Sequence, residues 1–280
     1  MSIQASLGQN SGFQPQKRLG QHFLFKKSVL HKIVQAAKLN KNDWVWEIGP
    51  GQGSLTLELA KAAGKVLAIE KDYRLIPVLQ DRLKGFKNIN IVQGDARKIK
   101  PPQKPYKVVA NLPYYVATHL VRCFLEAKRP PTTMVLLVQK EVGQRICSQP
   151  PRMNLLAVAV QFYAQAEIIG RVPKAAFWPK PKVDGAVIRL KAKKKTQADK
   201  KLFFKIVRAG FSQPRKQLLN NLSQGLKLPK GKTKNWVCQN NINPEKRPQT
   251  ISLNNWLKLT ETFASLFPAC AIIKKQASTN

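Results

Sequence analysis

WVWEIGPGQG, residues 44–53, joins a short apolar run to three glycines at every second position. A run of this length is typical of a buried strand, and the pattern that follows it has helical periodicity. Glycine allows the backbone a sharp turn and lets a ligand approach where a Cβ would block it. A strand, a glycine turn and a helix in this order are typical of α/β sheets, whose ligands bind beyond the carboxyl ends of the strands.

The chain on both sides of this segment alternates between two patterns. Strands are predicted at 44–48, 66–69, 89–92, 107–110 and 134–138. Helices are predicted at 26–39, 55–63, 74–83, 117–127 and 140–147. Short apolar strands that alternate with helices favour a mostly parallel sheet covered on both faces.

A second region begins after the charged stretch KAKKKTQADKK, at 191–201. Three further helices are expected there, at 202–209, 215–222 and 252–267. The expected domains are therefore an α/β domain at 1–190 with an N-terminal segment at 1–42, a basic linker at 191–201, and a helical domain at 202–280.

The charge of the chain is unusual. Its 280 residues include 49 Lys and Arg but only 14 Asp and Glu, which gives a net charge of +35. So large a charge favours a polyanionic partner, of which nucleic acid is the commonest. Residues 186–280 hold 20 of the basic side chains and three of the acidic ones. The helical region is therefore the expected nucleic-acid-binding part.

Other classes of protein are disfavoured. No run of 18 apolar residues predicts a membrane span, and the first 16 residues lack the apolar core of a secretory signal. The four cysteines and three histidines have no metal-ligand spacing, so we expect no metal site.

Three acids lie at the tips of three successive strands. Glu47 precedes the glycines, and Ser54 stands where the dinucleotide pattern G-x-G-x-x-G needs its third glycine. A carboxylate beside a helix N-terminus suits a zwitterionic ligand better than a pyrophosphate. Glu70 ends the second strand, where a carboxylate can bind both hydroxyls of a ribose, and Asp95 follows the third. Together they indicate one cofactor site.

The fourth strand ends in Asn111-Leu112-Pro113-Tyr114. These residue types suit the exocyclic amine of a base, whose lone pair is delocalised into the ring. The side-chain oxygen of Asn111 and a main-chain carbonyl at Leu112 or Pro113 can accept its two N–H bonds and favour a tetrahedral nitrogen. Pro113 stiffens the turn, and Tyr114 offers a ring on which a base can stack. Alone, Asn-x-Pro-Tyr would be an ordinary turn; after this strand it predicts catalysis by positioning and fixed dipoles.

The glycine turn, the acids and the Asn-Leu-Pro-Tyr motif resemble those of S-adenosylmethionine methyltransferases, and more narrowly those of the ribosomal RNA adenine dimethyltransferases, over about residues 17 to 265. The resemblance implies a class I methyltransferase fold: a Rossmann-like, mostly parallel seven-stranded sheet with a small C-terminal helical domain. It implies S-adenosyl-L-methionine as cofactor and N6,N6-dimethylation of adenines in small-subunit ribosomal RNA. The partner would be an immature small subunit, and the enzyme a cytoplasmic monomer in ribosome biogenesis.

The resemblance also implies roles for single residues. The segment at 20–24, GQHFL, is similar to one whose third and fifth residues contact the cofactor, although many members have Asn in place of His22. The segment FWPKPKV is similar to a family motif whose Phe stacks on the target base, and this role carries over to Phe177. Gly185 stands where the family usually has Ser. The predicted catalytic residues are Asn111, Leu112, Pro113, Tyr114 and Phe177. The predicted cofactor-binding residues are His22, Leu24, Glu47, Gly49, Gly51, Gly53, Glu70, Asp95, Ala96 and Asn111.

Three alternatives remain open. The erythromycin-resistance methyltransferases, which modify large-subunit ribosomal RNA, share the resemblance but more often have Ile in place of Leu112. A non-catalytic RNA-binding assembly factor would be equally basic, but it would not need Glu70, Asp95 and the 111–114 motif together. A nicotinamide dehydrogenase is disfavoured by the missing third glycine and by the lack of an acid–base pair.

Overall fold

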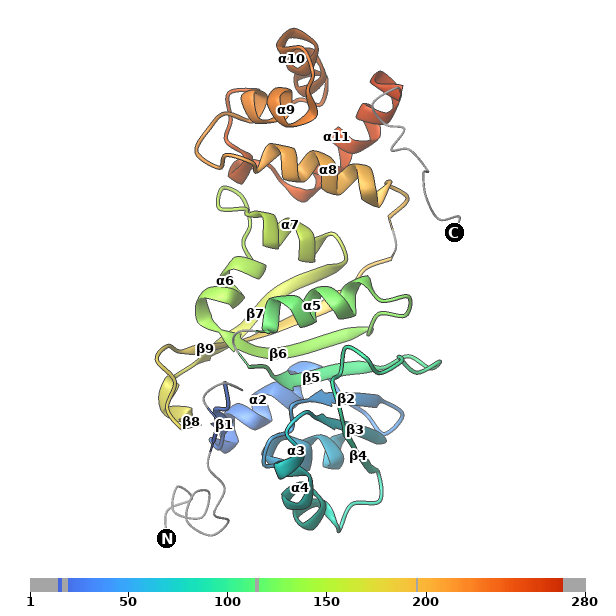
Figure 1. Cartoon of the computed structure of the whole chain (residues 1–280), viewed down its shortest axis with the longest axis vertical. Coiled ribbons are helices and arrows are strands. Elements are labelled where there is room, and N and C mark those ends of the chain that lie inside the picture. The colour runs from blue at the N-terminus through green and yellow to red at the C-terminus, as the bar shows by residue number, and fades with distance from the viewer. Residues whose placement is uncertain (1–14, 17–19, 114–115, 195, 269–280) are drawn as a thin grey trace. The chain divides into compact units, whose positions relative to one another are not determined.

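The computed structural model describes residues 15–16, 20–113, 116–194 and 196–268, which divide into two compact units (Figure 1). Unit 1 contains the described residues of Met1–Gln144 and Ala164–Lys193, and unit 2 those of Arg145–Tyr163 and Lys194–Asn280. Residues 145–163, which the sequence analysis placed in the first domain, group with unit 2. The chain therefore passes between the units three times.

A seven-stranded sheet forms the centre of unit 1. Its strands, in the order β4-β3-β2-β5-β6-β9-β7, are Ile89–Gln93, Lys65–Glu70, Trp44–Ile48, Lys107–Asn111, Thr133–Gln139, Gly185–Ala192 and Ala164–Val172. The first five strands are parallel, and β9 is antiparallel to both β6 and β7. The strand order reverses between β2 and β5, and ligands of such sheets bind at the carboxyl ends of the strands beside that reversal. The predicted fold class and all five predicted strands are confirmed.

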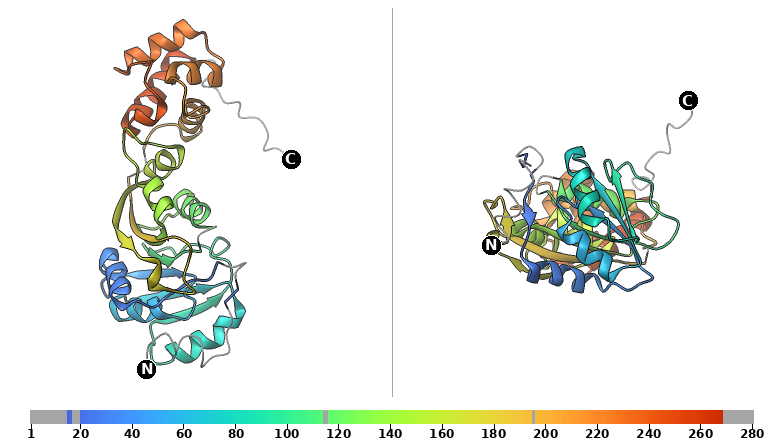
Figure 2. Two further views of the ribbon diagram at one scale, coloured as in Figure 1. Left: turned by 90° about the vertical axis from the view of Figure 1, so that its left-hand side faces the viewer. Right: turned by 90° about the horizontal axis from the view of Figure 1, so that it is seen from below.

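Helices cover both faces of this sheet (Figure 2). The helices α2 (Lys27–Ala37) and α3 (Ser54–Ala62) pack on the face that includes Val45. The next side chain along β2, Trp46, points to the other face, because successive side chains of a strand alternate. There its ring meets Phe124 of α5 (Ala117–Glu126) edge-on at 6.3 Å. Helices α4 (Ile76–Leu83) and α6 (Lys140–Ile146) complete the helices of this alternating region.

A separate two-stranded sheet joins distant segments of unit 1. Strand β1 (Phe23–Leu24) pairs antiparallel with β8 (Phe177–Trp178), so that Leu24 lies opposite Phe177. The N-terminal segment and the Phe-Trp-Pro-Lys-Pro segment, about 150 residues apart along the chain, are therefore held side by side.

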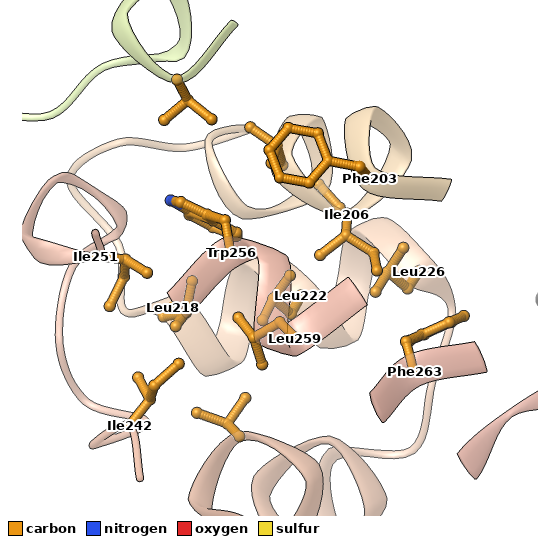
Figure 3. Packing of buried hydrophobic residues seen from close by; sticks show 14 of the residues in the cluster. Phe203, Ile206, Leu218, Leu222, Leu226, Ile242, Ile251, Trp256, Leu259 and Phe263 are labelled. Carbon is orange, nitrogen blue, oxygen red and sulfur yellow. The ribbon is translucent and has the colours of Figure 1, made fainter. Parts of the chain in front are cut away.

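Among the described residues of unit 2, five helices pack around a core of their own (Figure 3). They are α7 (Leu155–Gln161), α8 (Lys200–Gly210), α9 (Leu218–Leu226), α10 (Lys230–Gln239) and α11 (Leu253–Leu266). Phe203, Trp256 and Phe263 are fully buried at its centre. Ala157 and Val158 of α7 join the same cluster, which explains why residues 145–163 belong to this unit.

The boundaries differ from those predicted near residue 191. Strand β9 extends to Ala192 and α8 begins at Lys200, so the charged stretch is shorter than the predicted linker and contributes to both elements. Asp199 explains where α8 begins, because its carboxylate accepts hydrogen bonds from the N–H groups of Lys201 and Leu202 at 2.7 and 3.1 Å.

Candidate active site

A cavity lies at the carboxyl ends of the parallel strands of unit 1. Its walls come from the N-terminal segment, the glycine turn, and the ends of β3, β4 and β5. The predicted site residues that line it are His22, Leu24, Glu47, Gly49, Gly51, Glu70, Asp95, Ala96, Asn111, Leu112 and Pro113. Gly53 and Phe177 are not among the lining residues, and Tyr114 lies outside the described residues.

The glycine turn requires glycine for two different reasons. Gly49, Gly51 and Gly53 have φ angles of 67°, 60° and 81°, in the left-handed region that other residues rarely adopt. A Cβ on Gly51 would also lie 2.9 Å from Cδ1 of Phe23. The turn therefore packs directly against β1, while Gly53, as the N-cap of α3, acts through backbone conformation.

Glu70 connects the end of β3 to the glycine turn. Its side chain is buried and accepts hydrogen bonds from the N–H groups of Gly51 at 3.0 Å and Asp72 at 2.8 Å. Burial raises the pKa of this carboxyl, although these backbone donors oppose the shift. The backbone N–H of Lys71 also donates to this carboxylate, which lines the cavity and keeps part of its acceptor capacity for a ribose diol.

Glu47 is the most deeply buried acid at the site. Its side chain is 1% exposed, and burial, aided by the nearby Glu70 charge, raises its pKa to about 8. The nearby Thr56 hydroxyl opposes this shift, but no hydrogen bond of ordinary geometry reaches the Glu47 Oε2 atom from the described residues. A buried acceptor without a partner is costly unless a ligand supplies the donor. The ammonium group of an amino-acid moiety fits this requirement.

Asp95, which follows β4, forms an ion pair with a neighbouring arginine side chain. Arg97 forms an ion pair with it, and the Arg97 Nε donates to Oδ1 at 2.8 Å. These hydrogen bonds from Arg97 lower the pKa of Asp95 far below its usual value, so the group is an acceptor at neutral pH. Arg97 also lines the cavity and was missed from the sequence.

Asn111 ends β5 with its amide orientation fixed. Its Nδ2 donates to the main-chain carbonyl of His22 at 2.9 Å. Because a carbonyl can only accept, the amide nitrogen must face His22, which leaves Oδ1 as the acceptor toward the cavity. The adjacent turn is held by hydrogen bonds from the Leu112 N–H to Leu137 O at 3.1 Å and from the Val116 N–H to Pro113 O at 3.2 Å.

His22 joins three predicted motifs. Its carbonyl holds Asn111, and its ring Nδ1 lies 2.6 Å from the carbonyl of Pro179, so that this nitrogen carries the proton and donates it. The N-terminal segment, the Asn-Leu-Pro-Tyr turn and the Phe-Trp-Pro-Lys-Pro segment thus meet at one residue.

Phe177 is placed differently from the other predicted catalytic residues. Its side chain is 3% exposed and packs in the core cluster that includes Leu24 and Val187. A Cβ on Gly185 would lie 2.9 Å from Cδ1 of Leu137 and 3.6 Å from the tip of the Phe177 ring. Glycine at 185 is therefore part of the close packing around this ring.

The side chain of Asp72, which the sequence analysis did not select, holds the N-terminal segment at the cavity through Gln21. Asp72 is buried and accepts from Gln21 Nε2 at 2.8 Å and from Arg74 Nε at 2.9 Å. Hydrogen bonds from Arg74, followed by those from Gln21, lower the pKa of Asp72. The sequence could have indicated Asp72, because this acid lies two residues after Glu70 at the end of the same strand.

Metal ligands do not gather in the part of the chain that the structure describes, which contains no group of three or more His, Cys, Asp or Glu that could hold a metal ion. No helix within the same residues is long and apolar enough to cross a membrane.

The chain is similar in sequence to known proteins. Residues 12–265 match the family model of ribosomal RNA adenine dimethylases. The chain is 42% identical over 259 residues to ribosomal RNA small subunit methyltransferase A of Dehalococcoides mccartyi, covering 89% of this chain and 88% of that protein. It is 39% identical over 275 residues to the protein of the same name from Anoxybacillus flavithermus, covering 91% and 92%.

The fold is also similar to those of solved structures. The fold is similar to that of the 23S rRNA methyltransferase ErmE, with a TM-score of 0.74 and 27% identity over 85% of this chain and 98% of that one. A dimethyladenosine transferase from Plasmodium falciparum has the same TM-score and identity, over 88% and 98%. The family model and the relatives together show that the chain belongs to the ribosomal RNA adenine dimethylase family.

Proposed function

We propose that the protein transfers methyl groups from S-adenosyl-L-methionine to N6 of adenines in small-subunit ribosomal RNA, two to each adenine. Family membership supports the reaction, and the names of the relatives from Dehalococcoides and Anoxybacillus support the small subunit as target. The single observation that carries the proposal is the fixed amide of Asn111, whose Oδ1 is left as an acceptor in the cavity that also holds Glu70 and Asp95.

The cavity walls fit the parts of this cofactor. Glu70 has acceptor capacity for the ribose hydroxyls. Asp95 lines the same cavity, and to accept from the adenine amine its carboxylate must exchange part of its hydrogen bonding with Arg97. The unpartnered Oε2 of Glu47 suits the ammonium of the methionine moiety. When bound, S-adenosyl-L-methionine supplies an electrophilic methyl group on its sulfonium.

The residues of this chain prepare the acceptor nitrogen. Oδ1 of Asn111 accepts one N–H of the adenine amine, and a main-chain carbonyl of the turn accepts the other. We assign that carbonyl to Leu112, because one of the two lone pairs of the Pro113 carbonyl already accepts the N–H of Val116, which leaves that oxygen less available. These two acceptors favour a tetrahedral nitrogen with its lone pair directed away from the ring. After methylation the nitrogen is positively charged and acidic, so its proton leaves to water without a general base.

The experiment is label transfer to purified ribosomal particles. Small subunits that lack this modification, and separately large subunits, are incubated with the protein and methyl-labelled cofactor, and RNA nucleosides are identified by mass spectrometry. We expect N6,N6-dimethyladenosine in small-subunit RNA only. Label confined to large-subunit RNA would instead support the activity named for ErmE, to which the fold is also similar. Absence of label from both would refute the proposed function.

A further inference from the structure

Lysines gather at the amino-terminal edge of the sheet in unit 1, the edge opposite the cavity. In the strand register Trp44, which begins β2, lies beside Lys65, which begins β3, and Val45 lies beside Lys107, which begins β5. The turn before β2 adds Lys38 and Lys41, the end of α3 adds Lys61, and the loop before β5 adds Lys104. We call these six lysines the amino-edge cluster: Lys38, Lys41, Lys61, Lys65, Lys104 and Lys107.

Several of these side chains are held in place. Nζ of Lys107 donates to the carbonyl of Lys38 at 2.8 Å, and Nζ of Lys41 donates to the carbonyl of Lys61 at 2.6 Å. The Nζ atoms of Lys65 and Lys104 lie 4.5 and 5.9 Å from the centre of one Trp44 ring. Cations over an aromatic ring and on backbone carbonyls are restrained relative to free lysine side chains. The cluster is therefore an organised set of positive charges.

Acidic groups neutralise only part of this charge. Lys107 pairs with Asp43 at 2.9 Å, and Lys61 pairs with Glu58 at 2.9 Å. No carboxylate of the described residues lies within ion-pairing distance, 4.0 Å, of Lys38, Lys41, Lys65 or Lys104, and all four are exposed. Like charges held together repel, and a polyanion relieves that repulsion while it releases counterions.

We infer that the amino-edge cluster binds the phosphate backbone of structured RNA at a place remote from the target adenine. The inference rests on the proposed function for the identity of the polyanion. Strand β2 alone separates the two edges by about 16 Å, at roughly 3.3 Å for each of its residues. A contact there involves RNA outside the immediate surroundings of the adenine that reaches Asn111, so it requires a folded RNA larger than the target loop.

The test compares two triple variants with the same loss of charge. Lys41→Gln, Lys65→Gln and Lys104→Gln alter the cluster, and Lys27→Gln, Lys32→Gln and Lys84→Gln, exposed lysines on α2 and after α4, are the control. Binding to immature small subunits is measured between about 50 and 200 mM salt. If each cluster lysine contacts a phosphate, the slope of log K against log salt becomes shallower by about 2–3, at roughly 0.9 for each contact by analogy with DNA. We expect less than half that change in the control.

Two further measurements separate the possible failures. A Lys→Arg triple at the three cluster positions keeps the charge and should restore the wild-type slope, and a short stem-loop that carries only the target adenine should bind the wild-type and cluster-variant proteins equally. Equal salt slopes for the cluster and control variants would overturn the inference. If wild-type protein still labels small-subunit RNA in that case, the proposed function stands and only the remote contact is lost.

Discussion

Asn111 and Glu47 lie in one cavity but differ in how their polar atoms are used. The Asn111 amide has its nitrogen bound to the carbonyl of His22, so one atom of known type remains for the substrate. Glu47 has a buried oxygen with no partner among the described residues. In the proposed function the first residue accepts from the base and the second accepts from the cofactor, and each assignment has a measurable consequence.

Asn111→Ala should reduce methyl transfer about 100- to 1,000-fold, the usual effect of removing one preorganised dipole that acts on the reacting group. Affinity for S-adenosyl-L-methionine should stay nearly unchanged, because the contact matters most as the amine becomes tetrahedral. The rate of label transfer and calorimetric cofactor binding are the two measurements. Turnover within about threefold of wild type would contradict the role assigned to Asn111.

Glu47 should make stability fall as pH rises. Its pKa is about 8 in the folded protein against an ordinary value of 4.5, so the folded state holds a proton that the unfolded chain releases between these values. The free energy of unfolding should therefore decrease from about pH 4.5 to about pH 8, by up to about 5 kcal/mol. Glu47→Gln should remove most of that decrease in denaturant unfolding. Identical pH dependence in both proteins would show that Glu47 is ionised throughout.

At the scale of elements, β1 and β8 convert separate motifs into one site. Their pairing brings the N-terminal segment to the glycine turn and to the segment that contains Pro179. Asp72 secures the same segment from the other side through Gln21. The wall of the cavity is thus built by short segments whose positions depend on a few hydrogen bonds.

Asp72→Ala should therefore weaken cofactor binding although Asp72 is not itself a predicted ligand. It removes charge-assisted hydrogen bonds to Gln21 and Arg74, each worth roughly 1.5–3 kcal/mol, and we expect about tenfold or more in the cofactor dissociation constant. Asp81→Ala is the matched control, since Asp81 is an exposed acid of the same region that pairs with Lys84. Equal affinities for the two variants would remove Asp72 from the site.

The elements that the sequence predicted share a simple signature. Strands such as β6 are continuous apolar runs bounded by polar residues, and β2 leads directly into the glycine turn. Helix α10 was missed because its sequence, KGKTKNWVCQ, contains a glycine and three lysines and buries only Thr233, Trp236 and Val237. Strand β7 was missed because its exposed positions break the apolar pattern.

The site followed the same rule. Acids at strand ends and the Asn-Leu-Pro-Tyr turn could be selected from the sequence because the proposed chemistry needs those residue types at those places. The Asn111–His22 and Asp72–Gln21 hydrogen bonds join residues 89 and 51 positions apart, and no local pattern predicts such long-range pairs. The burial of Phe177 likewise depends on the pairing of β1 with β8.

At the scale of the whole molecule, the two units share one chain without a single boundary between them. Met153, Ala157 and Val158 belong to the core of unit 2 although they precede β7 and β9 of unit 1. Removing everything after residue 190 would therefore expose apolar side chains of α7. The contribution of unit 2 to RNA binding is better tested by substitutions on its surface.

Lys230→Gln, Lys232→Gln and Lys234→Gln in α10 should weaken binding to small ribosomal subunits and make its salt dependence shallower. All three lysines are exposed, whereas the buried residues of this helix are left intact. Cofactor affinity should not change, because every residue that lines the cavity belongs to unit 1. Unchanged salt dependence would show that these lysines are ordinary solvated surface.

The late pairing of β6 has a consequence for synthesis on the ribosome. Leu137 of β6 pairs with Val187 of β9, which is translated 50 residues later. Residues 145–163, which belong to unit 2, are synthesised between the two strands. At about 5–20 residues per second, this edge of a very apolar strand waits roughly 3–10 s for its partner. A nascent chain that stalls before β9 would present an unpaired, aggregation-prone edge, so slow translation through 145–184 should increase the demand for chaperones.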